Sequence, residues 1–351
     1  MKEAFVTAGP TVEIKDVPIP EPGPDQVVTK VVVSGSNPKD WKVAEWVPKA
    51  GPINQGDDIS GTVHAVGTNV TEFKVGDRVA AFHEMMSPHG SYAEYALSWQ
   101  HTTFHLPQHT SFEEGASTPL AAMTAALGLY QRLGLPEPWQ RNSPIGKPFA
   151  TEPLVIWGAG SAVGSYALQL AARSNIHPLI CVAGKSTEHV KQFIDPQKGD
   201  TIIDYRPGTA HVSSQIKSLL AGTPLRYAFD AVSDHGSYQT LSSLLDLQQG
   251  KITLVLPGKE YPEIPASILK TITSVGSVHK DDADKDFAYV FFRYFSRGLA
   301  EGWFKGQPTV TVPGGLGGIQ KALTDLKEGR ASAVKYVFRI EETEGVVGWG
   351  L

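Results

Sequence analysis

The sequence predicts an α/β protein with two parts, a compact barrel-like β domain and a doubly wound parallel sheet. Three observations support this fold class. The first third contains short apolar runs separated by turn clusters rich in Gly, Pro and Asp, which is typical of a compact β domain. From residue 154 onward, short apolar runs alternate with helical patterns, as in a parallel sheet covered on both faces. The length of 351 residues is sufficient for two domains.

Composition excludes several classes of protein. The chain has 31 Lys and Arg against 36 Asp and Glu, a net charge of −5, and no basic run, which argues against nucleic-acid binding. The single cysteine, Cys181, excludes an internal disulfide framework and a cysteine-rich zinc site. No stretch of about 18 apolar residues predicts a membrane span, and the N-terminus lacks the apolar core of a signal peptide. We therefore expect a soluble, cytoplasmic protein with no membrane or nucleic-acid partner.

The β-rich part begins with three predicted strands, at residues 27–33, 61–66 and 78–82. A helical pattern begins at Ser111-Phe-Glu-Glu, which has the arrangement of a capping box and leads into an Ala-rich run at residues 115–129. The polar, Pro-rich stretch 135–153 is predicted to be a loop or an insertion.

The alternating part follows. Strands are predicted at residues 154–157, 178–183, 201–204, 227–232, 251–256 and 271–278. Helices are predicted between them at residues 161–173, 187–194, 213–220 and 238–247. Beyond Asp281 the alternation stops, and an aromatic helix at 287–298 precedes a final strand at 334–340 that could return to the first part. More than half of residues 287–295 are Phe or Tyr, which favours a core helix over a pocket wall; in a pocket, they would indicate a large apolar substrate.

A glycine-rich turn gives the sharpest local signal. Gly158-Ala-Gly160-Ser-Ala-Val-Gly164 follows a predicted strand and opens a predicted helix. Glycines at such a turn let the backbone approach a pyrophosphate, whose charge the helix N-terminus stabilises. The spacing G-x-G-x-x-x-G departs from the strict dinucleotide fingerprint, so an ordinary tight turn is the alternative. The repeated strand–helix pattern favours a cofactor site with contacts from Gly158, Gly160, Ser161, Ala162 and Val163.

The residues after the next two strands favour NADPH over NADH. No Asp or Glu occurs between Gly164 and Glu188, where an NAD site has a carboxylate for the ribose hydroxyl. The second strand instead ends in Gly184-Lys185-Ser186, and the third is followed by Tyr205 and Arg206. A pair of cations suits a 2′-phosphate, although Lys185 and Arg206 could simply be solvated.

Several blocks occur in an order typical of one superfamily. They are Asn37-Pro-Lys-Asp40-Trp-Lys42 and the segments 56–61, 66–79, 90–95, 121–125, 158–164, 204–205, 229–232 and 314–316. Over nearly its whole length the sequence resembles the medium-chain dehydrogenase/reductase superfamily. Within it, the sequence is most similar to the zinc-free quinone and enoyl reductases, and above all to the stand-alone trans-acting enoyl reductases of fungal polyketide pathways. The resemblance implies a GroES-like β-barrel catalytic domain at 1–118 and 285–351, interrupted by a Rossmann NADPH-binding domain at 119–284.

The resemblance also implies that no metal is bound. Zinc-dependent members place Cys where Asn37 stands, His where Asp57 stands and another Cys near Leu120, and their structural zinc needs four cysteines. His83, His89, His101 and His105 lack ligand spacing, so we expect surface or structural roles for them.

Without zinc, the reaction left to this family is hydride delivery from NADPH to an electrophilic carbon, with charge developing on a remote oxygen. Lys42 and Thr124 are the candidate catalytic residues, since each could contact the nicotinamide or the developing oxyanion. The alternatives are a surface lysine and a helix-capping threonine. Because no Tyr occurs between Asn37 and Gly61, water or Lys42 is the expected proton source.

The remaining expected cofactor contacts come from three regions. The Asn-Pro loop, which lines the nicotinamide cleft in this family, supplies Asn37, Pro38, Asp40 and Lys42. The ends of the later strands supply Val232, Val255, Leu256, Gly276 and Val278, because ligands lie beyond the carboxyl ends of parallel strands. The C-terminal segment supplies Val334 and Lys335, by resemblance.

Three functions stay open at this point. The first is an NADPH-dependent reductase of the conjugated double bond in an enoyl thioester or α,β-unsaturated ketone, with a small-molecule or carrier-bound acyl substrate and a polyketide synthase as a possible partner. An acidic carrier would need a basic patch, for which Lys39, Lys42 and Lys49 are candidates. The second is an NADPH:quinone oxidoreductase or a carbonyl or imine reductase. The third is a non-catalytic NADPH-binding partner. Both a monomer and a homodimer are compatible with the sequence.

Overall fold

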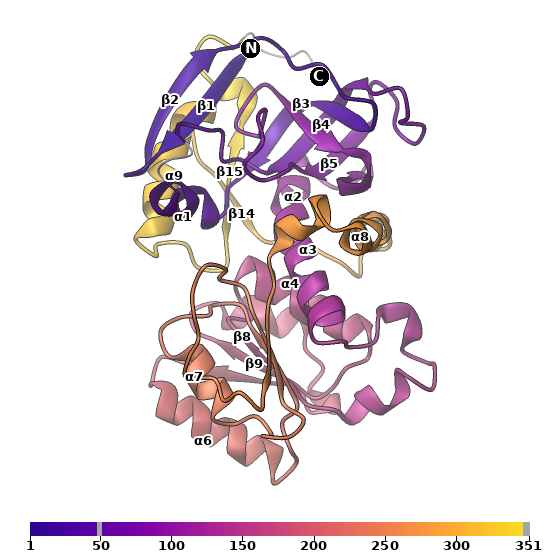
Figure 1. The fold of residues 1–351 in the computed structure, drawn as a ribbon, viewed down its shortest axis with the longest axis vertical. Coiled ribbons are helices and arrows are strands. Elements are labelled where there is room, and N and C mark those ends of the chain that lie inside the picture. Colours follow the sequence, from indigo (N-terminus) through magenta and orange to yellow (C-terminus); the bar gives the residue numbers. More distant parts are fainter. Residues whose placement is uncertain (48–50, 347–351) are drawn as a thin grey trace. The chain divides into compact units, whose positions relative to one another are not determined.

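The computed structural model describes residues 1–47 and 51–346, so Lys49 lies outside the described residues. The chain divides into two compact units (Figure 1). Unit 1 comprises Met1–Leu120 and Gly276–Leu351, and unit 2 comprises Ala121–Val275. From the sequence we expect the chain to return from the Rossmann domain to the catalytic domain between residues 284 and 285. The structure assigns residues 276–284 to unit 1 as well. The reason is local packing, because the Val278 carbonyl bonds His101 and the His279 ring lies 4.9 Å from that of Phe82.

Unit 1 is built on a seven-stranded sheet. Its order is β14 (Thr309–Thr311), β15 (Lys335–Arg339), β3 (Gln26–Gly35), β4 (Asp58–Val66), β5 (Arg78–Phe82) and β7 (Thr103–His105), with β6 (Tyr95–Trp99) also paired to β3. A separate hairpin joins β1 (Lys2–Thr7) to β2 (Thr11–Asp16). β15 pairs antiparallel to β3, with Val337 opposite Gly35, so the final strand does return to the first part.

In the described part of this unit, five α-helices occur wholly or partly: α1 (Lys39–Trp46), α2 (Phe112–Ser117), the start of α3 (Pro119–Ala126), α8 (Asp282–Glu301) and α9 (Ile319–Lys327). In α2 the Ser111 side chain accepts from the Glu114 N–H, as the capping pattern predicts. α8 buries the rings of Phe287, Phe291, Phe292 and Phe295, so the aromatic run is mainly core. Tyr289 is the exception, with 48% of its surface exposed.

Unit 2 contains a six-stranded, wholly parallel sheet. The order is β10 (Thr201–Asp204), β9 (Leu179–Ala183), β8 (Leu154–Trp157), β11 (Tyr227–Asp230), β12 (Lys251–Leu254) and β13 (Leu269–Ile272). The chain runs outward from β8 to β10 and then restarts beside β8 at β11. This reversal is the topological switch point at which doubly wound sheets bind ligands.

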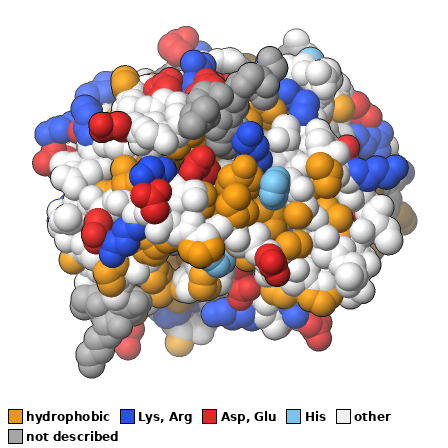
Figure 2. All heavy atoms as spheres, turned by 90° about the horizontal axis from the view of Figure 1, so that it is seen from above, with side chains coloured by type: hydrophobic (Ala, Val, Ile, Leu, Met, Phe, Trp, Pro, Cys, Tyr) orange, Lys and Arg blue, Asp and Glu red, His pale blue; other side chains and the backbone are white. Residues whose placement is uncertain are grey.

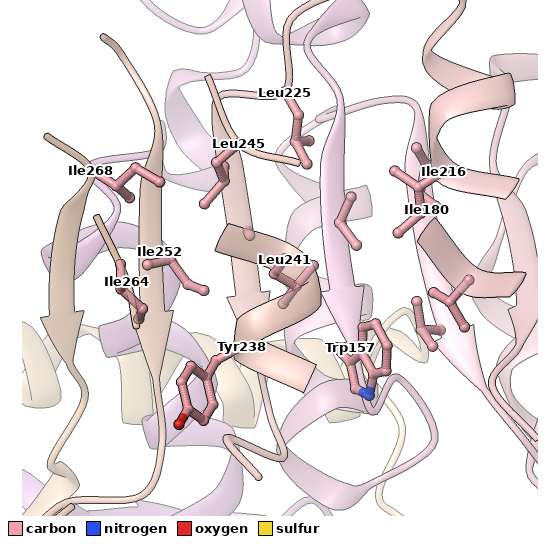
Figure 3. Packing of buried hydrophobic residues seen from close by; sticks show 14 of the residues in the cluster. Trp157, Ile180, Ile216, Leu225, Tyr238, Leu241, Leu245, Ile252, Ile264 and Ile268 are labelled. Atoms are coloured by element: carbon pink, nitrogen blue, oxygen red, sulfur yellow. The ribbon is translucent and has the colours of Figure 1, made fainter. Parts of the chain in front are cut away.

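Apolar side chains of the sheet and of the helices that cover it form the core of unit 2 (Figure 3). Figure 3 shows Trp157, Ile180 and Ile252 on strands, with Ile216 and Leu241 packed from helices. The helices that contribute to this cluster are α6 (Thr209–Leu220) and α7 (Ser237–Ser242), and the unit also contains α4 (Ala162–Arg173) and α5 (Thr187–Val190). The continuous apolar strands follow from burial on both faces.

Some predicted boundaries are wrong. The helix predicted at 238–247 ends at Ser242, because the chain turns there so that Leu245 can pair with Leu225. The strand predicted at 271–278 ends at Ile272, and Val275–His279 forms a 3₁₀ turn. The Ala-rich run 115–129 is divided among α2, α3 and a π-helical turn at Leu127–Arg132. The segment 135–153 contains only two short 3₁₀ turns.

No helix among residues 1–47 and 51–346 is long and apolar enough to cross a membrane. On the face shown in Figure 2, positive and negative side chains are interspersed around hydrophobic ones. That face therefore has no large patch of a single charge.

Candidate functional site

The glycine turn of unit 2 forms at the switch point between β8 and β11. Gly158 has φ = +79°, a conformation that favours glycine. The Ser161 side chain then caps α4 by accepting from the Gly164 N–H at 3.1 Å. Ala162 and Val163 are the first helical residues, whose N–H groups have no acceptor within a helix. The turn thus aims backbone donors and a helix dipole at one place, as a phosphate group requires.

Close packing explains two of the other predicted glycines. A Cβ atom on Gly160 would lie 1.9 Å from the Ser186 Oγ, and one on Gly184 would lie 2.7 Å from the ring of Tyr205. Either substitution would push a neighbour out of place. The structure therefore brings Gly160, Gly184, Ser186 and Tyr205 together, as the sequence predicts for a dinucleotide site.

The two cations near this turn differ in their partners. Lys185 is exposed and makes no hydrogen bond or ion pair with any residue that the structure describes. Arg206 instead donates to Asp204, with its Nε 2.9 Å from both carboxylate oxygens, and these bonds lower the pKa of Asp204 to about 2. Arg206 thus has an ion-pair partner two residues away, and the basic pair of Lys185 and Arg206 stays a prediction.

The turn after β11 depends on a buried carboxylate that the sequence analysis missed. Asp230 accepts from the N–H groups of Val232 (3.0 Å) and Ser233 (2.8 Å) and from the Ser237 hydroxyl (2.6 Å). Burial raises its pKa to about 6, against the lowering effect of these donors. The Ser233 Oγ in turn accepts from the Val255 N–H at 2.9 Å. Asp230 and Ser233 thus hold Val232 and Val255 at the carboxyl edge of the sheet.

Three other residues that the sequence predicts at the site, Val232, Leu256 and Thr124, belong to unit 2. Val232 packs on the turn, since a Cβ atom on Gly158 would lie 2.7 Å from its Cγ2. The Leu256 carbonyl accepts from the Tyr261 hydroxyl at 2.8 Å. Thr124 is buried in α3. Gly276 and Val278 do not end a strand of this sheet; they belong to the 3₁₀ turn of unit 1.

In unit 1, a buried cluster joins Asn37, Asp58 and Lys335. The Lys335 ammonium donates to the Asn37 Oδ1 at 3.1 Å and to Asp58. Asp58 also accepts from the Asn37 Nδ2 and from the Leu120 N–H, both at 2.7 Å. By resemblance, Asn37 and the neighbourhood of Leu120 are zinc-ligand positions, and here they surround an internal ion pair. Val334 precedes β15 and so lies beside this cluster in the sequence.

A second cluster centres on Lys39, which the sequence analysis considered only for a surface patch. Its Nζ lies 3.2 Å from the Asp40 carboxylate and also contacts Asp57. Asp57 is 3.2 Å from the His83 Nδ1, and Asp40 accepts from the Tyr92 hydroxyl at 2.5 Å. The expected surface or structural role of His83 is thus refined to a buried partner of Asp57. No sequence signal links these residues, because they come from four separate segments.

Electrostatics differ within the Lys39 cluster. Burial raises the pKa of Asp40 to about 6, although Lys39 opposes the shift. Burial acts on the pKa of Asp57 in the same direction, but Lys39 and His83 outweigh it and hold this pKa below its ordinary value. Burial opposes the charge of Lys39, yet the two carboxylates outweigh it and raise the pKa of the ammonium. Lys39 therefore stays charged.

Lys42, three residues after Lys39 in α1, has aromatic neighbours. Its Nζ is 5.6 Å from the ring centre of Trp41 and 5.7 Å from that of Trp46, distances typical of cation–π contacts. Pro38 is exposed at the start of the helix. Lys39 and Lys42 thus have different surroundings although they are three residues apart.

Within residues 1–47 and 51–346, no three His, Cys, Asp or Glu side chains are arranged to hold a metal ion. The acidic residues at the zinc-ligand region already have cationic partners, since Asp57 contacts Lys39 and Asp58 contacts Lys335.

Comparison with known proteins supports the predicted fold class. The family model of the alcohol dehydrogenase GroES-like domain matches residues 23–108. The chain is 56% identical to the trans-enoyl reductase fsr4 of Gibberella fujikuroi over 314 residues, which cover 90% of this chain and 91% of that protein. It is 29% identical to the trans-enoyl reductase ACTTS2 of Alternaria alternata over 94% of this chain and 96% of that protein.

Solved structures share the two-unit α/β fold. A putative zinc-dependent alcohol dehydrogenase from Rhizobium etli superposes with a TM-score of 0.81 at 22% identity, covering 100% of this chain and 99% of that one. The CurK enoyl reductase gives 0.76 at 17% identity, covering 96% and 98%. A mycobacterial protein complexed with NADPH gives 0.73 at 19% identity, covering 96% and 99%. These likenesses confirm a GroES-like domain together with a Rossmann-type parallel sheet.

Proposed function

The chain belongs to the trans-enoyl reductase family, and on that premise we propose that it uses NADPH to reduce the conjugated double bond of an enoyl thioester or α,β-unsaturated ketone, without zinc. The observation that carries the cofactor assignment is the surroundings of the glycine turn. The backbone donors at the start of α4 suit a pyrophosphate, and the exposed Lys185 suits a 2′-phosphate. No Asp or Glu occurs between Gly164 and Glu188 to repel that phosphate.

The residues of unit 2 would hold the cofactor as follows. Gly158, Gly160, Ser161, Ala162 and Val163 would surround the pyrophosphate. Lys185, Ser186 and Tyr205 would surround the adenosine ribose and its phosphate, next to Gly184. Val232, Val255 and Leu256 would lie toward the nicotinamide end. When bound, NADPH supplies the hydride, and the rest of the chemistry falls to the side chains.

The ion pairs of unit 1 support a mechanism without zinc. A catalytic zinc needs three protein ligands with free lone pairs. Asn37 and Asp58 are committed to Lys335, and Asp57 is committed to Lys39. These groups can fix charge and hydrogen bonds in place, but a metal would have to displace two buried ammonium groups.

We also propose that Lys39, rather than Lys42, is the lysine that stabilises the developing enolate. Its ammonium touches Asp57, which stands at a zinc-ligand position by resemblance, whereas Lys42 is engaged with indole rings. The Lys39 ammonium donates to the Gln55 carbonyl and contacts Asp40 and Asp57, so on this proposal it exchanges one of these partners for the enolate oxygen and can then pass a proton onward. Thr124 stays our candidate for a hydroxyl contact in unit 2.

The nature of the substrate follows from the family. We propose an acyl chain of fungal polyketide type, presented on a carrier by a polyketide synthase. Quinone reduction by the same cofactor is the runner-up, and a non-catalytic NADPH-binding role is the third candidate.

The test is NADPH oxidation, with NADH as comparison, against enoyl thioesters, enones, quinones and simple aldehydes. Deuteride from C4 of labelled NADPH should appear at the β-carbon of the enoyl product, as measured by mass spectrometry. Activity should survive dialysis against a chelator, with no zinc found by elemental analysis. Faster turnover of quinones would favour the runner-up. NADPH binding without turnover of any acceptor would favour the non-catalytic role, and a preference for NADH would overturn the assignment of Lys185.

A further inference from the structure

A cavity of about 490 Å³ lies within unit 1, apart from both charged clusters. Its lining includes Trp99, His101, His279, Lys285 and Tyr289, from the end of β6, the following turn, the Val275–His279 turn and α8. The volume falls in the range of small-molecule sites. The function argued above uses none of these side chains.

His279 is the unusual residue in this cavity. Only 8% of its surface is exposed, and neither ring nitrogen has a hydrogen-bond partner within residues 1–47 and 51–346. The backbone of Phe82 is near the ring but does not meet the geometry of a hydrogen bond. A buried polar group without a partner costs roughly 1–3 kcal/mol. The unpaired nitrogens of His279 therefore lower the stability of the free protein, and a ligand that forms hydrogen bonds with the ring would remove this loss.

Burial, together with His101 and His83, lowers the pKa of His279 to about 3, so the ring is neutral. A neutral imidazole has one N–H donor and one lone pair. His101 has a defined tautomer, because its Nε2 lies 2.9 Å from the Val278 carbonyl, which can only accept. Its Nδ1 is then an acceptor in the neutral ring, and burial lowers the pKa of His101 as well. The two rings lie 5.9 Å apart, centre to centre.

These features indicate the chemistry of the ligand. The rim has both signs of charge, since Asp25 and Asp286 accompany Lys285, and Lys285 is paired with Asp282 at 3.0 Å. An anion would find no net positive charge there. A hydroxyl group both donates and accepts, so it can pair with either ring nitrogen of His279 in either tautomer and with the Nδ1 of His101. The rings of Trp99 and Tyr289 suit an apolar chain next to that hydroxyl.

The cavity also adjoins the region of the proposed chemistry within unit 1. The His279 ring packs on Phe82, and the next residue, His83, contacts Asp57 of the Lys39 cluster. A second cavity, of about 220 Å³, is lined by His83 and shares Trp99 with the first. Trp99 therefore lines both cavities.

We propose that this cavity binds a hydroxyl-bearing part of the acyl chain of the substrate, with His279 as the residue that recognises the hydroxyl. The proposal rests on the proposed reductase function. It makes the enzyme selective for partly oxygenated chains over fully reduced ones, a property that the hydride-transfer step does not itself require.

The experiment compares ω-hydroxy-trans-2-alkenoyl pantetheine thioesters of six to fourteen carbons with their unhydroxylated counterparts. The measured quantity is the ratio of kcat/KM, hydroxylated over plain, at each chain length. We expect the ratio to reach at least tenfold at one or more lengths in the wild type. His279→Phe should abolish the preference, whereas His211→Phe, an exposed histidine of α6, should retain it. A ratio near one at every length, or an unchanged ratio in His279→Phe, would overturn the proposal.

Two further measurements keep the outcome interpretable. His279→Phe should unfold at the same temperature as the wild type or a higher one, because a phenyl ring removes the two unpartnered nitrogens. A lower unfolding temperature would mean that the ring is structural and would count against the proposal. If no thioester is reduced at all, the proposed function fails on its own. Calorimetric binding of the saturated ω-hydroxy and plain pantetheine thioesters then decides the cavity question, since no double bond is needed, and equal affinities would refute it.

Discussion

Lys335→Met tests whether the ion pair at Asn37 and Asp58 supports unit 1. The substitution keeps most of the apolar stem and removes the ammonium, which donates to Asp58 and, at 3.1 Å, to Asn37. Both ionic side chains are almost fully buried, at 3% and 0% exposure. The variant therefore leaves a carboxylate inside the protein without its cation.

The expected magnitude follows from what remains around Asp58. Breaking a buried pair on one side costs about 3–5 kcal/mol. The carboxylate keeps two bonds, from the Asn37 Nδ2 and the Leu120 N–H at 2.7 Å each, so the lower end of that range applies. For a unit of this size, about 1 kcal/mol shifts the unfolding temperature by roughly 2–4 °C. We expect the transition of unit 1 to fall by roughly 6–12 °C.

Differential scanning calorimetry of the full chain, with and without NADPH, is the assay. The cofactor should stabilise unit 2 selectively, so it helps to separate the two transitions. Adding Asp58→Asn to Lys335→Met removes the buried carboxylate charge that has lost its cation. The double variant should recover at least half of the lost unfolding free energy. A loss below about 1 kcal/mol, or a double variant no more stable than the single one, would refute the reasoning.

Three further predictions concern the cofactor, the catalytic lysine and a buried acid. Lys185→Ala should raise the KM for NADPH about 5- to 30-fold, because one exposed charge-assisted hydrogen bond of roughly 1–2 kcal/mol is lost. The KM for NADH, measured in the same assay, should stay the same. Lys39→Met should lower kcat about 100-fold or more, and Lys42→Met should lower it less than tenfold. The Lys39→Arg variant and the unfolding temperatures of all variants separate lost chemistry from lost stability. Equal effects of the two Met variants on kcat would contradict the choice of Lys39 as the catalytic lysine. The pKa of Asp230 is about 6 in the folded state and 3.8 ordinarily, so the folded state binds more protons between these two values. The free energy of unfolding should therefore fall as the pH rises from about 4 to 6. Urea unfolding should show that this pH dependence is weaker in Asp230→Asn.

The fold could be predicted to a large extent from local pattern. The strands of unit 2 carry continuous apolar runs and stand between helical patterns, so periodicity and turn residues suffice. The segment Val275–His279 was misassigned because Val275 and Val278 fit a strand by composition, and only the bond from His101 to the Val278 carbonyl reveals their place in unit 1. The two residues of this contact are 177 positions apart in the sequence, so no local pattern indicates it.

The site was predictable where one segment forms it. The glycine turn and the Gly184-Lys185-Ser186 segment each carry their own signal. Lys39 and Lys42 do not, because both lie on one short helix and their roles depend on Asp57, which another segment supplies. Arg206 differs from these lysines, because its partner Asp204 lies two residues before it in the sequence and only the side-chain geometry shows that the two are paired.

In the proposed mechanism a lysine takes the place of a zinc ion, and this has a consequence for the type of reaction. A zinc ion stabilises an alkoxide by direct coordination, which serves alcohol oxidation. An ammonium such as that of Lys39 would stabilise an enolate oxygen by donating a hydrogen bond to it, not by coordination. It could also hand over a proton, which an enolate needs at its α-carbon and an alkoxide needs at its oxygen. The Asp57 and Asp40 carboxylates keep Lys39 protonated between turnovers, since both raise its pKa. On the proposed mechanism this arrangement of charges serves an enolate, and the relative rates with enoyl thioesters and with simple aldehydes measure directly which of the two reductions it favours.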